Sequence, residues 1–284
     1  MNNIQKNRIK DQLFKFWGIA CTLFGLVLLT VFIGDILIDG LARIDWSFIM
    51  NLPSRKPEKA GIYTALMGSI WILLLTTIIS FPVGVAAGIY LEEYSKKNWL
   101  SGVLEINISN LAGVPSIIYG LLGLEVFVRI MGLGASVLAG SLTLSLLILP
   151  IIIVATREAI KAVPNSIKDA SYALGASKWQ TIWNQILPAS GGGILTGVIL
   201  ALSRAVGETA PLIVVGALAY VPFAPQNPMD EFSVLPIQIF NWISRPQHGF
   251  IENAAAAIII LLAITFIMNG IAVYFRNKWQ KKWS

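Results

Sequence analysis

The chain has 284 residues, of which 56% are hydrophobic and 13% are charged, and its formal net charge is +6 at pH 7. Soluble domains carry about 25% charged residues, so this composition excludes an ordinary soluble fold and predicts a membrane protein. The single cysteine, Cys21, lies within the first apolar run. An intrachain disulfide and a cysteine metal cluster are therefore both excluded.

Apolar runs of about 20 residues, the length that crosses a hydrocarbon core as a helix, recur along the chain. The predicted spans cover residues 16–38, 63–91, 108–128, 134–156, 190–220 and 254–275. We therefore expect an all-α polytopic protein with six transmembrane helices, a polar tail over residues 1–15 and one membrane domain over 16–284. The first run is too long for a cleavable signal peptide, and no A-x-A site follows it, so we interpret it as a retained helix.

Lysine and arginine are distributed unevenly between the two sides that six spans create. With a cytoplasmic N-terminus, 14 of the 21 lie inside, 6 lie outside and Arg204 falls within a span. The inside set is Lys6, Arg8, Lys10, Lys15, Lys96, Lys97, Arg157, Lys161, Lys168, Lys178, Arg276, Lys278, Lys281 and Lys282. The outside set is Arg43, Arg55, Lys56, Lys59, Arg129 and Arg245. Because positive charge favours the cytoplasmic side, we expect both termini inside.

Glycine and proline predict irregular backbone and close packing within the spans. The third span is expected to be broken by Gly113, Pro115, Gly120 and Gly123. Broken backbone at membrane depth is tolerated only where protein or a water-filled cavity satisfies the freed polar groups. Glycine pairs spaced four apart allow helices to approach closely, and they occur at Gly84 with Gly88 and at Gly193 with Gly197.

The polar segment 157–188 is too long for a simple turn. Residues suited to capping or ending short helices predict two helices joined by a glycine turn: Asn165 or Ser166 and Ser177 as N-caps, Gly175 and Pro188 as stops. An amphipathic hairpin that lies on the membrane surface is the alternative interpretation.

The same segment resembles the cytoplasmic EAA loop of ABC importer permeases, whose pattern is E-A-A-x3-G-x9-I-x-L-P. Five residues are in register with that pattern: Asp169 (at the glutamate position), Ala170, Gly175, Leu187 and Pro188. Ser171 and Gln185 depart from it. The resemblance implies that the loop docks on a separate ATPase subunit.

ATP is expected to be used by another polypeptide, because the sequence has no G-x-x-x-x-G-K-[ST] loop to hold its phosphates. We therefore expect a transporter subunit that binds no cofactor itself and is not an enzyme.

Arg204 and Glu208 lie one helical turn apart within the fifth span, so they share a helix face. Charged residues at this depth normally face the bundle interior or a cavity. Arg204 offers a planar fork of donors that matches two phosphate oxygens, and Ser203 and Thr209 can supply neutral hydrogen bonds. Glu208 would accept a hydrogen bond from protonated phosphate and disfavour sulfate, which carries no proton at neutral pH. An ion pair that only fixes helix packing is the alternative.

Two further runs resemble the permeases of Pst-type phosphate ABC importers, namely R-A-x-G-E-T-A-P at 204–211 and G-V-P-S-I-I-Y-G at 113–120. The run V-L-P-I-Q-I-F-N-W at 234–242 is similar to the PstA-type rather than the PstC-type subunit. By position in these motifs, the resemblance implies a phosphate path lined by Arg204 and Glu208, with Pro115, Ser116 and Tyr119 contributed by the third span.

The resemblance also implies a type I ABC importer permease in the bacterial inner (plasma) membrane. Its expected partners are a PstC-type permease, two copies of a cytoplasmic ATPase subunit, an external phosphate-binding protein, inorganic phosphate and membrane lipid, but no nucleic acid.

Other classes of membrane protein fit the sequence less well than an importer permease. An ion-coupled secondary transporter or a gated channel would explain six spans and buried charges, but it would not explain the register of the 157–188 segment. A membrane enzyme is poorly supported by one histidine, one cysteine and no H-E-x-x-H or G-x-S-x-G run. Another oxyanion is the alternative substrate.

The proline-rich outer segment 221–253 is interpreted as a binding-protein dock, an outer gate or a cover for the pore.

Overall fold

A computed structural model describes residues 3–96, 98–217 and 220–280, and this part of the chain is helical with no strand. Among the described residues, five helices are long and apolar enough to cross a membrane, and one bent helix pair can supply a sixth span. The all-α prediction with six spans is therefore confirmed. Several residues used in the predictions lie outside the described residues, namely 1–2, Lys97, 218–219 and 281–284 with Lys281 and Lys282.

The long helices are α1 (Asn3–Gly40), α3 (Tyr63–Ile89), α6 (Val137–Lys161), α9 (Leu187–Val206) and α12 (His248–Gln280). The bent pair is α4 (Trp99–Leu111) and α5 (Ser116–Gly123). The shorter helices are α2 (Trp46–Met50), α7 (Asn165–Ala173), α8 (Lys178–Thr181), α10 (Ala210–Val215) and α11 (Leu235–Ile243). Wider π-helical turns cover Tyr90–Tyr94, Leu124–Ile130 and Ile182–Ile186, and 3-10 turns cover Leu41–Arg43 and Pro57–Lys59.

Helix α6 lies at the centre of the fold, and α3 and α9 pack against it. A Cβ added to Gly84 or Gly88 of α3, or to Gly193 or Gly197 of α9, would lie 2.2–2.8 Å from α6 side chains. This confirms the close helix approach expected from these glycine pairs. Across the α3–α6 contact, the Thr76 hydroxyl donates to the carbonyl oxygen of Ser141 (3.3 Å), so these two polar groups are paired within the apolar core.

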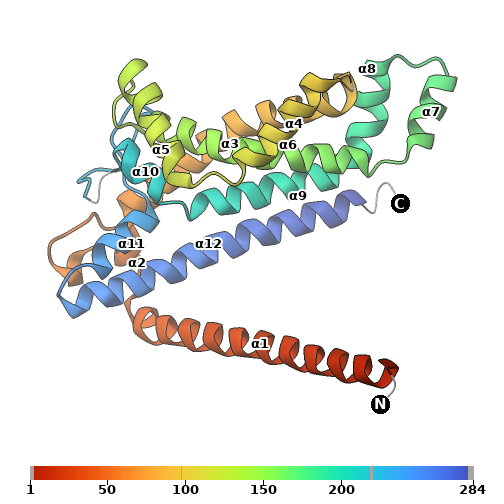
Figure 1. Cartoon of the computed structure of the whole chain (residues 1–284). Coiled ribbons are helices and arrows are strands. Elements are labelled where there is room, and N and C mark those ends of the chain that lie inside the picture. The colour runs from red at the N-terminus through yellow and green to blue at the C-terminus, as the bar shows by residue number, and fades with distance from the viewer. Residues whose placement is uncertain (1–2, 97, 218–219, 281–284) are drawn as a thin grey trace.

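The elements gather at two ends of the bundle (Figure 1). Helix α1 begins, α12 ends and the α7–α8 hairpin projects at one end, which we term the hairpin end. Helices α2 and α11 and the connections around them lie at the opposite end, termed the loop end. Helix α1 meets α12 near the loop end, where Gly40 lies against the backbone of Ala255, and the two helices diverge toward the hairpin end.

The third span is broken as predicted, because its two halves, Ser101–Leu111 and Ser116–Ile130, are bent by 102°. Gly113 and Pro115 lie in this break, as predicted, whereas Gly120 and Gly123 lie at helical positions in α5. The prediction that these last two glycines interrupt the span was wrong. They instead allow close contacts, since an added Cβ would meet Pro211 at Gly120 and Thr143 at Gly123.

The hairpin confirms two of the predicted helix signals. Helix α7 ends in a Schellman motif, in which Gly175 has a φ of +82° and the Ala176 N–H donates to the Ser171 carbonyl oxygen. The Ser177 side chain caps α8, and Gln180 reciprocates by accepting from the Ser177 N–H.

The other two predicted signals were wrong. Neither Asn165 nor Ser166 is the N-cap of α7, because the helix begins at Asn165 and Pro164 precedes it without a side-chain cap. Nor does Pro188 end the second helix, which continues from α8 through the π-turn into α9. The wider hydrogen-bond spacing of that turn accommodates a proline ring that would clash inside a regular α-helix.

Candidate functional site

Two interrupted helices meet beside α6. Helix α9 ends at Val206 and α10 begins at Ala210, so the predicted fifth span is broken across 207–209. Helix α10 packs against α5, the second half of the other interrupted span. The contact is close, because a Cβ on Gly120 would lie 2.7 Å from the Pro211 Cα. Non-helical backbone within a membrane span is tolerated only where protein or a water-filled cavity satisfies its polar groups, so this junction is the candidate site.

Arg204 and Glu208 flank the break in α9 and contact each other, as their spacing predicts. The Arg204 Nε donates to the Glu208 Oε1 at 3.3 Å. The Arg204 side chain is 43% exposed, whereas that of Glu208 is 16% exposed. Within the described part of the chain, the two terminal guanidinium nitrogens of Arg204 have no hydrogen-bond acceptor. The arginine is therefore neutralised by the protein but keeps donors that are not engaged.

Tyr119 lies at the same junction and is buried. Its hydroxyl donates to the Leu111 carbonyl oxygen at 2.8 Å, and so satisfies an acceptor at the α4–α5 break. Tyr119 packs in the same buried apolar cluster as Ala205 of α9 and Leu212 of α10. Ser116 is the first residue of α5 and Thr209 precedes α10, and both are half-buried. The structure thus brings Tyr119, Arg204 and Glu208 into one region, at the ends of helices that carry Ser116 and Thr209.

Ser203 is engaged with a different helix. Its hydroxyl donates to the Asn269 Oδ1 of α12 at 2.6 Å, which ties α9 to α12 within the bundle. Sequence reasoning did not single out Asn269. A single amide within the apolar run of α12 was the available signal, since polar side chains in spans usually bond to a neighbouring helix.

The predicted ATPase-coupling residues fall into two groups. Asp169, Ala170 and Gly175 are exposed on the projecting hairpin. All of α7 lies within the described residues, and none of its side chains is buried. Leu187 and Pro188 instead lie half-buried at the start of α9.

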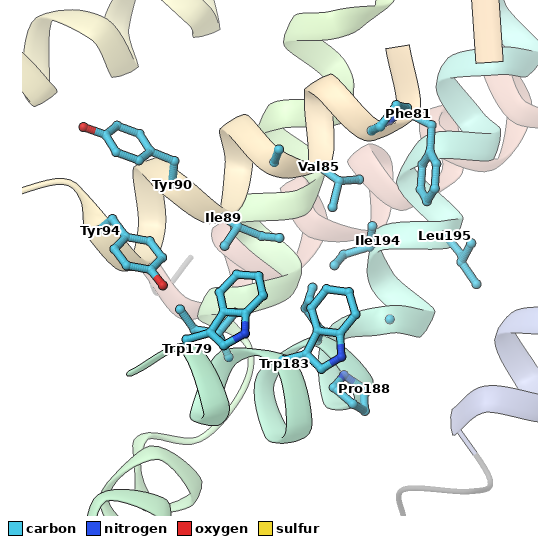
Figure 2. A pocket seen from close by; sticks show the side chains of 15 residues that line it. Phe81, Val85, Ile89, Tyr90, Tyr94, Trp179, Trp183, Pro188, Ile194 and Leu195 are labelled. Atoms are coloured by element: carbon cyan, nitrogen blue, oxygen red, sulfur yellow. The ribbon is translucent and has the colours of Figure 1, made fainter. Parts of the chain in front are cut away.

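An apolar groove of about 760 Å³ lies beside the base of the hairpin, between α3 and the start of α9, and Leu187 and Pro188 line it. Figure 2 shows Trp179 and Trp183 facing the α3 side chains across this groove. The two indoles stack with ring centroids 5.6 Å apart. The hairpin tip is thus solvent-facing, and its base is built into the bundle.

Comparison with protein families places most of the chain in one of them. The family model described as "Binding-protein-dependent transport system inner membrane component" matches residues 80–281. The phosphate transport system permease protein PstA of Yersinia pestis is 34% identical over 276 residues, which cover 96% of this chain and 91% of that protein. The probable ABC transporter permease protein YqgI of Bacillus subtilis (strain 168) is 30% identical over 274 residues, covering 91% of this chain and 93% of that protein.

Solved structures show the same fold. A chain of a bacterial alginate ABC transporter, in complex with its alginate pentasaccharide-bound periplasmic protein, has a TM-score of 0.70 at 11% identity and covers 99% of both chains. A chain of the inward-facing MetNI methionine ABC transporter has a TM-score of 0.62 at 15% identity, covering 77% of this chain and 97% of that one.

Proposed function

Because the chain belongs to the family of inner membrane components of binding-protein-dependent transport systems, we propose that it is the PstA-type permease subunit of an ATP-driven phosphate importer. It is a multi-pass inner-membrane protein, and named PstA permeases resemble it over most of its length. The observation that carries the proposal is the broken α9–α10 span, where Arg204 presents unengaged donors beside a second broken helix.

In the proposed mechanism, Arg204 lowers the barrier to an anion that passes the junction. A phosphate that leaves water must find compensating charge, and a guanidinium supplies it with a donor geometry that fits two oxygens. Glu208 holds Arg204 while the path is empty, and it accepts a hydrogen bond from a protonated phosphate when the path is occupied. Thr209 and Ser116 add neutral hydrogen bonds from the helix ends beside the junction.

The proposed assembly contains a PstC-type permease, two copies of an ATPase subunit and an external phosphate-binding protein. The exposed surface of α7 supports docking of the ATPase at the hairpin end. ATP is used by that subunit, so this chain contributes neither a cofactor site nor an enzymatic step. The excess of lysine and arginine at the hairpin end supports a cytoplasmic location for it.

Arg204→Gln in the complete complex tests this proposal. We expect ATP-driven phosphate uptake into proteoliposomes to fall by about tenfold or more, which corresponds to one lost charge-assisted contact. ATP hydrolysis and subunit assembly should persist.

The matched control is Arg129→Gln, which removes another i,i+4 pair, with Glu125 (3.0 Å), away from the helix breaks. Uptake that survives Arg204→Gln would make the pair structural. Uptake that continues with an inactive ATPase would favour an ion-coupled transporter or a channel instead.

A further inference from the structure

The π-helical turn Tyr90–Tyr94, which continues α3, contacts both arms of the hairpin. Lys168 of α7 donates from its Nζ to the Glu93 carboxylate at 2.5 Å. Lys178, which lies on the other side of the Gly175 turn, donates to the Glu93 carbonyl oxygen. The same ammonium group lies 4.9 Å from the centroid of the Tyr94 ring. Two adjacent residues of α3's terminal π-turn, Glu93 and Tyr94, therefore hold one cation from each arm; we term them the α3 clamp.

Within the clamp, the Glu93–Lys168 contact is sheltered from solvent, whereas Tyr94 is 42% exposed. The Glu93 side chain is 6% exposed and that of Lys168 is 20% exposed, so water and salt screen their attraction less than they screen a surface pair. The arms also bond to each other, since the hydroxyls of Ser171 and Thr181 lie 2.8 Å apart. That bond joins α7 to Thr181, which is buried at the base of the hairpin. Because α7 buries no side chain, its orientation depends on polar contacts, namely those of the clamp and the Ser171–Thr181 bond.

Helix α3 continues from the clamp to the opposite end of the bundle. Along its length it packs against α6 through Gly84 and Gly88. At the loop end, the Leu235 N–H donates to the Ser69 Oγ at 2.9 Å, and Gly68 faces the Ser233 carbonyl oxygen. One helix thus contacts the hairpin at one end and the start of α11 at the other.

We propose that Glu93 and Lys168 are positioning residues that fasten the hairpin to α3, so that α3 carries hairpin displacement to the loop end during transport. The chain connects the hairpin covalently to α6 and α9, and the clamp adds polar contacts with the end of the α3 span to the apolar cluster that Ile182 shares with Ile89. Rigid helices with discrete contacts at both ends transmit displacement in this way. This role rests on the proposed function, in which an ATPase moves the hairpin.

Glu93→Gln and Lys168→Gln in the complete complex test the coupling role. We expect assembly and ATP hydrolysis to persist while the phosphate transported per ATP falls by about fivefold or more, the lower end of typical coupling energies. The double variant should be no worse than either single variant, because both remove the same contact. The control is Glu158→Gln, which breaks an exposed pair with Lys161 at the same end of the bundle (3.0 Å) and should leave the ratio unchanged.

Hydrogen exchange of residues 165–181 in the same complexes tests the anchoring without any assumption about the substrate. Exchange should accelerate in Glu93→Gln and Lys168→Gln but not in Glu158→Gln. Unchanged exchange would overturn the clamp, and faster exchange with an unchanged transport ratio would overturn its role in coupling. A wild-type complex without ATP-driven phosphate uptake would instead refute the proposed function, and the exchange data would still decide whether the clamp anchors the hairpin.

Discussion

In the proposed mechanism, the Glu208 carboxylate alternates between two interactions at the α9–α10 break. It pairs with Arg204 in the structure, and it is oriented for the proton of a passing phosphate in the proposed mechanism. A fixed negative charge repels sulfate, which has no proton to donate near neutral pH, more than it repels a protonated phosphate. The negative charge of the carboxylate, rather than the size of the side chain, is therefore the proposed source of selectivity.

Glu208→Gln keeps the shape of the side chain and removes its charge. We expect phosphate uptake by the complete complex to fall by about tenfold, the effect of losing roughly 1.4 kcal/mol, and sulfate to become an effective competitor. Competition assays with labelled phosphate measure both effects, with Glu125→Gln as the control. Unchanged phosphate uptake together with continued exclusion of sulfate would contradict this selectivity mechanism.

Gly120 decides how closely α5 approaches α10. In Gly120→Ala, the new methyl would lie 2.7 Å from the Pro211 Cα and 3.0 Å from its carbonyl oxygen. Backbone atoms cannot move aside easily, so we expect a loss of about 1–3 kcal/mol in stability. A lower midpoint of thermal unfolding of the purified complex would show this loss of stability.

The control for that substitution is Gly102→Ala in α4, where an added Cβ has nothing within 4 Å. This change should be neutral or slightly stabilising, because alanine favours the helix. Equal midpoints for the two variants would mean that the α5–α10 contact is looser than the structure shows.

At the scale of elements, the junction depends on helices that stop within the bundle. The α4–α5 and α9–α10 breaks place helix ends and polar side chains together, and the Tyr119 hydroxyl satisfies the Leu111 carbonyl oxygen. The hairpin likewise depends on a single residue in the left-handed region, Gly175. Both features use local departures from the helix to position functional groups.

Gly175→Ala introduces backbone strain without a clash, since the position has a φ of +82° and no neighbour within 4 Å. The strain should destabilise the turn by about 1 kcal/mol. We expect less ATPase to copurify and uptake to decrease, while Gly175→Asn should retain more of both because asparagine adopts this conformation more readily. If alanine and asparagine both match the wild type, the conformation of the turn does not limit ATPase docking.

At the scale of the whole molecule, burial is unevenly distributed. In the most apolar windows of the spans, 61% of residues are buried in α6 but 6% in α1. Helix α1 meets α12 near the loop end and then diverges from it (Figure 1). Most of the α1 surface is therefore left for lipid or for the partner permease in the proposed assembly.

The proposed orientation can be tested on the whole chain with single cysteines in a Cys21→Ser background. A membrane-impermeant maleimide should label Lys56→Cys, near the loop end, in intact cells with the outer membrane permeabilised. It should label Gln185→Cys, near the hairpin, only after the inner membrane is opened. Both side chains are exposed, so access should depend on the side of the membrane. The reverse pattern would place the hairpin outside and exclude ATPase docking there.

The number of spans, the glycine turn of the hairpin and the proximity of Arg204 to Glu208 were predictable from the sequence. Each depends on composition or on residues a few positions apart, and such local patterns are fixed by helix geometry and by the length of an apolar run. The breaks near Pro115 and Gly207 could be anticipated in part, because proline and glycine weaken the helix locally.

Only the tertiary structure decided which distant groups meet. The Ser203–Asn269 and Glu93–Lys168 contacts join residues 66 and 75 positions apart, and the packing of Gly120 against Pro211 is likewise non-local. It also decided that the helix continues through Pro188, because the preceding π-turn relieves a clash that proline would cause in a regular helix. Local sequence sets what each segment can form, whereas packing between helices selects which polar groups are paired and where a span can break.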